Sequence, residues 1–264
     1  MSASPIASQQ TTCRISSTIV FELCVDTVEA ALAAERGGAD RIELCSSLAE
    51  GGLTPGPGLL RRVLQQVTLP VHAMIRPRGG SFLYSDDDLA AMEQDILYAR
   101  ASGCTGVVLG ILRENGSVDI ARTKHLVALA SSMEVTFHRA FDEARDLPEA
   151  LEHVIAAGAG RLLTSGGCAE VRGGSSIIAR LVKQAAGRGQ IAIGGGIDAD
   201  NVSQLVRKTG ATHVHASLRA RIRTATALGD ETAEGGRSFA LTTKAVREFA
   251  DAVRNVSPLV ASSR

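Results

Sequence analysis

Short apolar runs rich in β-branched residues alternate with longer amphipathic stretches along the chain from Ile19 onward. The short runs have the length of buried strands, and the longer stretches carry apolar residues at the spacing of one helix face. This alternation is typical of βα units built around a parallel sheet. Eight strands are expected, at residues 19–25, 41–45, 71–77, 106–112, 135–140, 161–165, 190–197 and 213–218.

Glycines mark the end of every second predicted helix. Gly38, Gly103, Gly158 and Gly210 each stand just before an even-numbered strand, where a left-handed glycine cap would end the helix. The pattern indicates a weak fourfold repeat, which suits a closed barrel better than an open sheet with two edges. The length of 264 residues also agrees with the roughly 250 of one such barrel. The sequence therefore predicts a single (β/α)8 TIM barrel, with an open doubly wound sheet as the alternative.

The two ends of the chain differ in composition from the predicted barrel. Residues 1–18 are rich in Ser, Thr, Gln and Ala without the cationic start and apolar run of a signal peptide, so we expect a disordered leader. The barrel is expected over residues 19–256, followed by a C-terminal tail at 257–264. An irregular segment at 224–236 follows the last strand and is a candidate loop over the mouth of the barrel.

Charge and cysteine content restrict the classes of partner. The 28 basic side chains balance the 28 acidic ones and no long charged block occurs, which speaks against nucleic acid or an anionic membrane. We expect a small molecule or a metal ion instead. The five cysteines form no closely spaced framework, as is typical of free thiols in a reducing compartment, so we expect a cytoplasmic protein.

The first two predicted strands each contain the tripeptide Glu-Leu-Cys. Alternate side chains of a strand share one face, so Glu22 lies on the face of Cys24, and Glu43 on the face of Cys45. An unpaired carboxylate is costly beneath a layer of helices, so both glutamates and both cysteines are expected to point into the barrel. Functional residues of such barrels lie at the carboxyl ends of the strands, which places the two thiols near the mouth.

The two cysteines are candidate ligands of a soft metal ion. Neighbouring parallel strands lie about 4.8 Å apart, so the sulfurs of Cys24 and Cys45 can come close enough to share one ion. Two thiolates without a nearby third Cys or His motif suit Cu(I) better than Zn, and Met74 is a candidate thioether ligand. The alternative is structural, because buried cysteines often fill apolar space and buried glutamates can anchor an arginine. A sulfur separation beyond about 7 Å would exclude a shared ion without movement.

Further polar groups stand at the ends of the third and fifth strands. Arg76 and Arg78 are candidates either for ion pairs with the glutamates or for binding a carboxylate or phosphate. His138 is a candidate acid, base or ligand, with a satisfied core histidine as the alternative.

The last two strands end in small and polar residues. Gly194, Gly195 and Gly196 close the seventh strand ahead of a predicted helix, and the eighth strand carries His215 and Ser217. Many barrels bind phosphate at this position through backbone N–H groups and a helix N-terminus, although glycine runs also serve tight turns. We treat these five residues, together with the two arginines, as candidate anion ligands.

Several of these features belong to longer motifs that occur in a fixed order. The motifs are Phe-Glu-Leu-Cys-Val-Asp at 21–26, Gly-Ala-Asp-Arg-Ile-Glu-Leu-Cys at 38–45, Gly-Gly-Leu-Thr-Pro at 51–55, Ile-Arg-Pro-Arg-Gly-Gly at 75–80, Tyr-Ser-Asp at 84–86, Phe-His-Arg-Ala-Phe-Asp at 137–142, Leu-Thr-Ser-Gly-Gly at 163–167 and His-Ala-Ser at 215–217. Together they resemble the CutC family, whose members are described as cytoplasmic copper homeostasis proteins. The resemblance implies a (β/α)8 barrel, a homo-oligomer such as a dimer or tetramer, and Cu(I) bound by cysteines that match Cys24 and Cys45.

Two functions are therefore expected. The first is non-catalytic Cu(I) binding by the cysteine pair. The second is an enzyme acting on a small phosphorylated or carboxylated compound, with Glu22, Glu43 and His138 as acid–base groups beside the anion ligands. The second hypothesis predicts a carboxylate of perturbed pKa at the mouth. A scaffold that works through an oligomer interface is a third possibility, for which the sequence offers no exposed apolar run.

Overall fold

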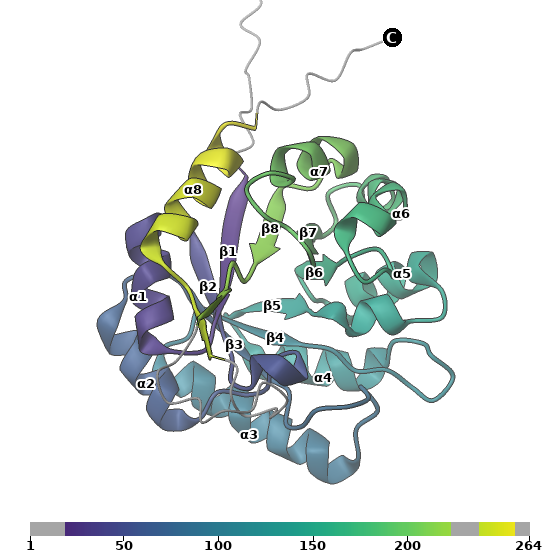
Figure 1. The fold of residues 1–264 in the computed structure, drawn as a ribbon. Helices are drawn as coiled ribbons and strands as arrows, with labels where there is room; N and C mark the ends of the chain where they lie inside the picture. The colour runs from purple at the N-terminus through teal and green to yellow at the C-terminus, as the bar shows by residue number, and fades with distance from the viewer. Residues whose placement is uncertain (1–18, 223–237, 257–264) are drawn as a thin grey trace, which may run out of the picture.

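The computed structural model describes residues 19–222 and 238–256 of the chain. Eight parallel strands follow one another around a closed barrel, and helices form a ring outside it (Figure 1). This arrangement confirms the predicted single (β/α)8 barrel and rules out the open sheet. The strands are β1 (Val20–Val25), β2 (Arg41–Leu44), β3 (Val71–Met74), β4 (Gly106–Leu109), β5 (Glu134–Phe137), β6 (Arg161–Thr164), β7 (Gln190–Gly194) and β8 (His213–Ala216).

Each strand is followed by an α-helix, and short 3-10 helices occupy two of the loops at the mouth. The α-helices are α1 (Val28–Gly37), α2 (Pro57–Gln66), α3 (Asp86–Ser102), α4 (Ile120–Ala130), α5 (Leu147–Ala157), α6 (Val171–Ala185), α7 (Val202–Thr209) and α8 (Thr243–Arg254). The 3-10 helices are η1 (Leu48–Glu50) and η2 (Arg139–Glu143). No helix in the described part of the chain combines the length and apolar character needed to cross a membrane.

The predicted glycine caps are confirmed. Gly38, Gly103, Gly158 and Gly210 follow α1, α3, α5 and α7, with φ values of +89°, +94°, +88° and +72°. Side chains other than glycine rarely adopt this left-handed conformation, so the glycines allow each helix to end and the chain to enter the next strand.

Several strands are shorter than predicted, and the difference lies at their carboxyl ends. The ladder of β3 ends at Met74 and that of β4 at Leu109, although Ile75 and Ile111 beyond them are fully buried. An apolar residue in the sequence indicates burial but not strand pairing. At the mouth of the barrel, buried residues continue into loops that no longer pair with the neighbouring strands. These loops shape the floor and walls of the cavity described below.

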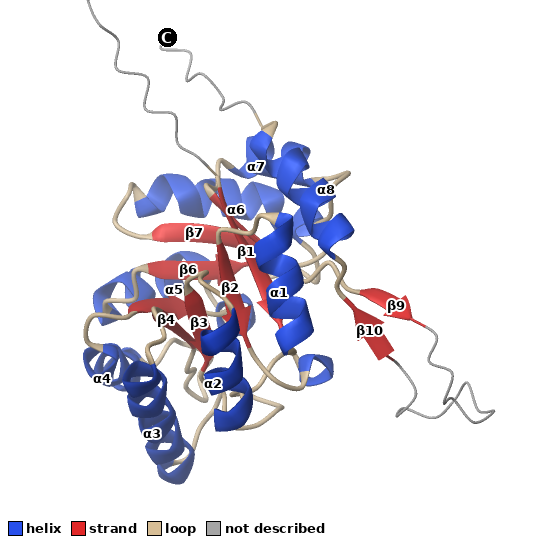
Figure 2. Cartoon of the chain, turned by 90° about the vertical axis from the view of Figure 1, so that its left-hand side faces the viewer, coloured by secondary structure: helices blue, strands red, loops and turns tan. Residues whose placement is uncertain are grey.

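Two further short strands lie outside the barrel. β9 (Ala220–Ile222) and β10 (Ser238–Ala240) pair in antiparallel fashion and project beyond α8 (Figure 2). The predicted leader, the C-terminal tail and the predicted loop at 224–236 lie outside the described residues.

The outward face of β1 packs into the core between the barrel and the helices. Phe21, Leu23 and Val25 are fully buried there, and the ring of Phe21 lies 4.7 Å from that of Phe249 on α8. Glu22 points into the barrel, where Arg41 and Arg161 approach its carboxylate to 2.7 and 2.5 Å. The predicted alternation of the strand is therefore observed, and this layer of ion pairs fills the barrel interior beneath the mouth.

Candidate functional site

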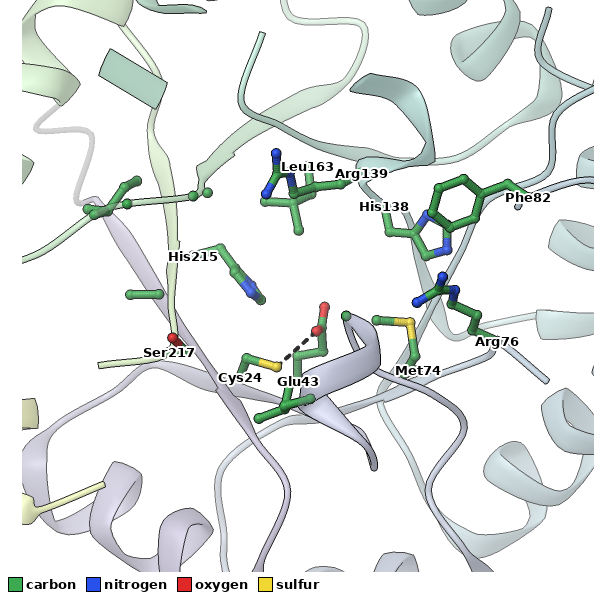
Figure 3. Close-up of a pocket in the computed structure, with 17 residues that line it drawn as sticks. Cys24, Glu43, Met74, Arg76, Phe82, His138, Arg139, Leu163, His215 and Ser217 are labelled. Atoms are coloured by element: carbon green, nitrogen blue, oxygen red, sulfur yellow. Dashed lines mark hydrogen bonds between the residues drawn. The ribbon is translucent and has the colours of Figure 1, made fainter. Parts of the chain in front are cut away.

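A cavity of about 320 Å³ opens at the carboxyl ends of the strands (Figure 3). Candidate residues from β1, β2, β7 and β8 and from the loops after β3 and β5 line it together. Those on its wall are Cys24, Glu43, Arg76, His138, Gly194, Gly195, Gly196, His215 and Ser217. The remaining candidates, Glu22, Cys45 and Arg78, do not line the cavity. Most of the residues selected from the sequence thus converge on one site.

The two cysteines are adjacent within a small buried cluster. Their Sγ atoms lie 3.4 Å apart, well inside the limit for sharing an ion. Cys24 faces the cavity, whereas Cys45 lies behind it with its thiol 3.6 Å from the carbonyl oxygen of Val25. Met74 packs in the same cluster, so three sulfur atoms gather beneath one wall of the cavity.

A thiol, a carboxylate and an imidazole meet beside this sulfur cluster. One ligand atom each of Cys24, Glu43 and His215 lies within 4.8 Å of the others, a spacing suited to a shared metal ion. The Cys24 thiol donates to Oε1 of Glu43 at 3.3 Å. The hydrogen bond with Cys45, burial and the charge of Glu43 raise the pKa of Cys24 well above its ordinary value. In the metal-free protein Cys24 is therefore a thiol rather than a thiolate at neutral pH.

Glu22 is held beneath this cluster and does not reach the cavity. It accepts a hydrogen bond from Arg161 and forms an ion pair with Arg41, and its Oε1 lies 2.8 Å from Nδ1 of His215. Burial alone would raise its pKa, but the hydrogen bond and charge of His215 and the nearby Arg41 lower it to about 2. Glu22 is thus an ionised anchor for Arg41, Arg161 and His215, the structural role that the sequence left open for buried glutamates.

Glu43 differs from Glu22 although both come from the same tripeptide. Its Oε2 is buried and has no hydrogen-bond partner, and burial raises the pKa of its carboxyl group. A buried oxygen without a partner costs about 1–3 kcal/mol, so this atom is a candidate contact for a ligand. Glu43 is therefore a carboxylate of raised pKa at the mouth, as the enzyme hypothesis predicts.

His215 is oriented as metal-bound histidines usually are. Glu22 fixes its Nδ1, which leaves Nε2 as the ring nitrogen available to a ligand on the side of Cys24 and Glu43. Burial opposes protonation of the ring, but the charges of Glu43 and Glu22 raise its pKa. The sequence indicated His215 as an anion ligand and did not foresee this pairing, because the two residues are far apart in the chain.

The two arginines after β3 lie in different surroundings. Arg76 lines the cavity and donates to the backbone carbonyl oxygens of Glu50, Gly52 and Gly80. Arg78 is half exposed and pairs with Asp88 at the start of α3, at 2.9 Å. Neither forms the predicted ion pair with Glu22 or Glu43.

His138 stands at the opposite side of the cavity from Cys24. Its Nδ1 accepts from the backbone N–H of Ala140, so the neutral ring carries its proton on Nε2. Burial, with the charge of Arg76, lowers its pKa to about 3. The Nε2 atom is buried without a partner, so His138 is not the fully satisfied core histidine that the sequence left as an alternative.

The glycine segment after β7 forms another part of the wall. Gly195 has a φ of +117°, and a Cβ atom there would lie 3.2 Å from Nη1 of Arg139. Arg139 in turn pairs with Asp142 at 2.8 Å and donates to Ser165. Sequence reasoning did not select Arg139 or Phe82 as cavity residues, although both belong to or follow segments that it did select.

The chain matches a model of a known protein family. Residues 19–220 match the profile described as the CutC family, which spans the whole barrel from β1 to β8. A "family protein CutC" from Chromobacterium violaceum is 46% identical over 206 residues, covering 78% of this chain and 83% of the relative. A "Copper homeostasis protein cutC homolog" from Homo sapiens is 48% identical over 200 residues, covering 76% and 73%.

A solved structure shows the same fold. A CutC protein from Streptococcus agalactiae superimposes with a TM-score of 0.72 at 32% sequence identity, covering 75% of this chain and 98% of the other. More distant barrels, such as thiamine phosphate pyrophosphorylase from Pyrococcus furiosus, reach a TM-score of 0.55 at 16% identity and share the architecture alone.

Proposed function

Because the chain belongs to the CutC family, we propose that it is a copper homeostasis protein that binds Cu(I) through Cys24 and Cys45. Copper here is cargo that the protein holds through the sulfurs at the mouth of the barrel. The name of the human relative supports a role in copper handling.

The observation that carries the proposal is the distance of 3.4 Å between the two Sγ atoms. A metal–sulfur bond measures about 2.3 Å, so one ion reaches both sulfurs after a small displacement of the side chains. Thiolate and thioether donors favour Cu(I) among the common metal ions, and Met74 adds a thioether to the same cluster. The donor set therefore fits the proposed ion.

Two neighbouring residues assist binding in this proposal. His215 offers Nε2 with its ring fixed by Glu22, and such carboxylate–histidine pairs commonly support metal ligands. Glu43 accepts from the Cys24 thiol and is placed to take its proton when copper binds. In this proposal the cysteines supply most of the affinity for copper. Glu43 accepts the proton that Cys24 releases, and His215 offers a further ligand atom.

We further propose that the protein works in the cytoplasm as a homo-oligomer. The four cysteines in the described residues are all free thiols, which suits a reducing compartment. The oligomer is an implication of the family resemblance, and sedimentation of the purified chain tests it.

Anaerobic competition between the protein and a Cu(I) chelator tests the proposal. The double variant Cys24→Ser, Cys45→Ser is expected to lose competition, because serine offers no soft donor. Cys104→Ser is the matched control, since Cys104 is also buried but precedes β4 at the far end of the barrel. Equal Cu(I) affinity of the double variant and the parent would overturn the proposal.

A second candidate function is an enzyme acting on a small phosphorylated or carboxylated compound. It is favoured by the unpartnered Oε2 of Glu43 and Nε2 of His138, which belong to residues lining one cavity large enough for a substrate. Glu43 would take a proton from carbon next to a carbonyl group, and His138 would donate a hydrogen bond to the developing oxyanion.

Deuterium incorporation tests this second function. Phosphorylated ketones and keto acids are incubated with the protein in D₂O, and loss of the C–H signal is followed by NMR. Exchange in the parent and in Cys24→Ser, but not in Glu43→Gln, is the expected result. No exchange with any compound, or equal exchange in Glu43→Gln, would exclude it.

A further inference from the structure

Arg76 carries a buried positive charge without a matching negative one. Arg76 is 6% exposed, and its Nη atoms donate to backbone carbonyl oxygens of the surrounding loops. Among the described residues no carboxylate lies within ion-pair distance of it, and its Nε has no partner. Buried charges are normally paired, because removing them from water is costly. The guanidinium of Arg76 is therefore a candidate contact for an anion.

A second unsatisfied donor stands beside Arg76. His138 is 4% exposed and presents Nε2–H without an acceptor. The ring stays neutral near pH 7, so it offers this hydrogen without adding charge. Buried donors nearly always have a hydrogen-bond partner. A carboxylate oxygen can accept from the Nε2–H of His138 and from the guanidinium of Arg76.

One aromatic ring holds the two donors in place. The Phe82 ring lies 4.9 Å from the His138 ring and 4.9 Å from Cζ of Arg76. The three side chains line the cavity on the side away from Cys24 and His215 (Figure 3). Because carbonyl oxygens fix Arg76 and the Ala140 N–H fixes His138, this wall is preorganised before any ligand binds.

We propose that Arg76, His138 and Phe82 form a receptor for the carboxylate group of a small organic acid that occupies the cavity. The acid places its carboxylate between the guanidinium of Arg76 and the Nε2–H of His138, and its carbon skeleton along Phe82. This site lies across the cavity from Cys24 and His215 and does not depend on copper (Figure 3). It adds a second, organic ligand to the proposed metal-binding function.

The charge at this wall selects a carboxylate over a phosphate. Arg76 supplies one positive charge and His138 none, which balances a carboxylate of charge −1. A phosphate group carries about −1.5 to −2 at pH 7, which exceeds the single positive charge of Arg76. The glycine segment after β7, which the sequence indicated as a phosphate site, is the competing position for an anion.

NMR titration of the ¹⁵N-labelled, copper-free protein tests the site with acetate, propionate and benzoate. Acetamide, propionamide and benzamide are uncharged probes of the same shape, and inorganic phosphate is the competing anion. At constant ionic strength we expect saturable shifts with at least one acid, at an affinity about tenfold or more above that of its amide. Equal binding of acid and amide, tighter binding of phosphate, or no saturable binding of any acid would overturn the proposal.

Three variants locate the bound acid. Arg76→Met removes the charge and is expected to weaken acid binding about tenfold or more, while His138→Phe keeps the ring and removes the donor, weakening it about threefold or more. Arg139→Met is the matched control, because Arg139 lines the same cavity but is paired with Asp142. Loss of binding in Arg139→Met with full binding in the other two would place the anion at the glycine segment and contradict the proposal.

The variants also separate this proposal from the others. The double variant Cys24→Ser, Cys45→Ser is expected to keep acid binding and to lose Cu(I) binding. The acid proposal and the copper proposal can therefore be refuted independently of each other. Should Arg76→Met not fold, His138→Phe and the acid–amide comparison on the parent still decide the result.

Discussion

The Nδ1 atom of His215 lies 2.8 Å from Oε1 of Glu22, and this contact joins the ion pairs inside the barrel to the cavity above them. Glu22 also forms ion pairs with two buried arginines, Arg41 and Arg161. One carboxylate therefore pairs with both buried arginines and fixes the imidazole that lies beside Cys24. Glu22 therefore contributes both to the stability of the barrel and to the orientation of His215 in the proposed metal site.

Glu22→Gln is expected to weaken both properties. Two arginines and His215 lose their counter-charge, so the free energy of unfolding should fall by about 3–5 kcal/mol. Cu(I) affinity should fall by about tenfold to a hundredfold, because His215 loses its support. Urea unfolding and chelator competition measure the two effects.

The control for this variant is Glu134→Gln. Glu134 also contacts Arg41, at 3.1 Å, but its side chain is 63% exposed, so its removal should change stability by less than about 1 kcal/mol. Equal effects of the two substitutions would refute the special role of Glu22.

Cu(I) affinity is expected to rise with pH. The hydrogen bond with Cys45, burial and Glu43 raise the pKa of Cys24, so the thiol is protonated in the metal-free protein and must lose its proton to copper. Each proton released gives about a tenfold increase in apparent affinity per pH unit. Competition titrations below, at and above neutral pH, corrected for the chelator, measure the slope. A flat profile would show that copper binds without displacing this proton.

The folded protein is expected to lose stability in mild acid. Burial lowers the pKa of His72 and His213 to about 4 and that of His138 to about 3. Between these values and the ordinary 6.5 the unfolded chain binds the protons that these three histidines exclude in the folded chain, so their contribution to stability is full above pH 6.5 and falls as the pH drops. At pH 5 the loss should be about 1–2 kcal/mol for each histidine. Glu22 extends it below pH 4.5, because its pKa is lowered to about 2.

Urea unfolding across this pH range measures the acid effect. His138→Phe should flatten the profile by the share of one histidine. An identical pH dependence in His138→Phe and the parent would show that His138 is not excluded from protonation.

Gly106→Ala is expected to destabilise the barrel by about 1–3 kcal/mol. A Cβ atom at this position would lie 2.5 Å from Cε1 of the buried His72 ring, which has no room to move inside the barrel. Gly160→Ala is the control, since its Cβ would meet nothing within 4 Å, and it should be neutral or slightly stabilising. Thermal unfolding of the two variants compares them directly, and a neutral Gly106→Ala would mean that the ring is not confined.

The fold could be predicted from the sequence because its signals are local. Alternating apolar runs, glycine caps and the parity of Phe21, Glu22 and Cys24 depend on neighbours in the chain, and all three are observed. The ends of the strands could not be placed, because Ile75 and Ile111 are as apolar as strand residues although they leave the ladder.

The site was predicted less completely than the fold. Parity brought Cys24, Cys45 and Glu43 together, since β1 and β2 are adjacent. It could not distinguish Glu22 from Glu43, because the partners of Glu22, Arg161 and His215, come from strands far away in the chain. Nor could it separate Arg76 from Arg78, whose surroundings depend on the path of the loop after β3.

X-ray absorption at the copper edge of the Cu(I)-loaded protein tests the central proposal most directly. It reports the atoms bound to the ion, independently of affinity. We predict sulfur neighbours at about 2.3 Å that are retained in Cys104→Ser and lost in Cys24→Ser, Cys45→Ser. Copper surrounded by nitrogen and oxygen alone, or an unchanged spectrum in the double variant, would contradict a copper site built on this pair of cysteines.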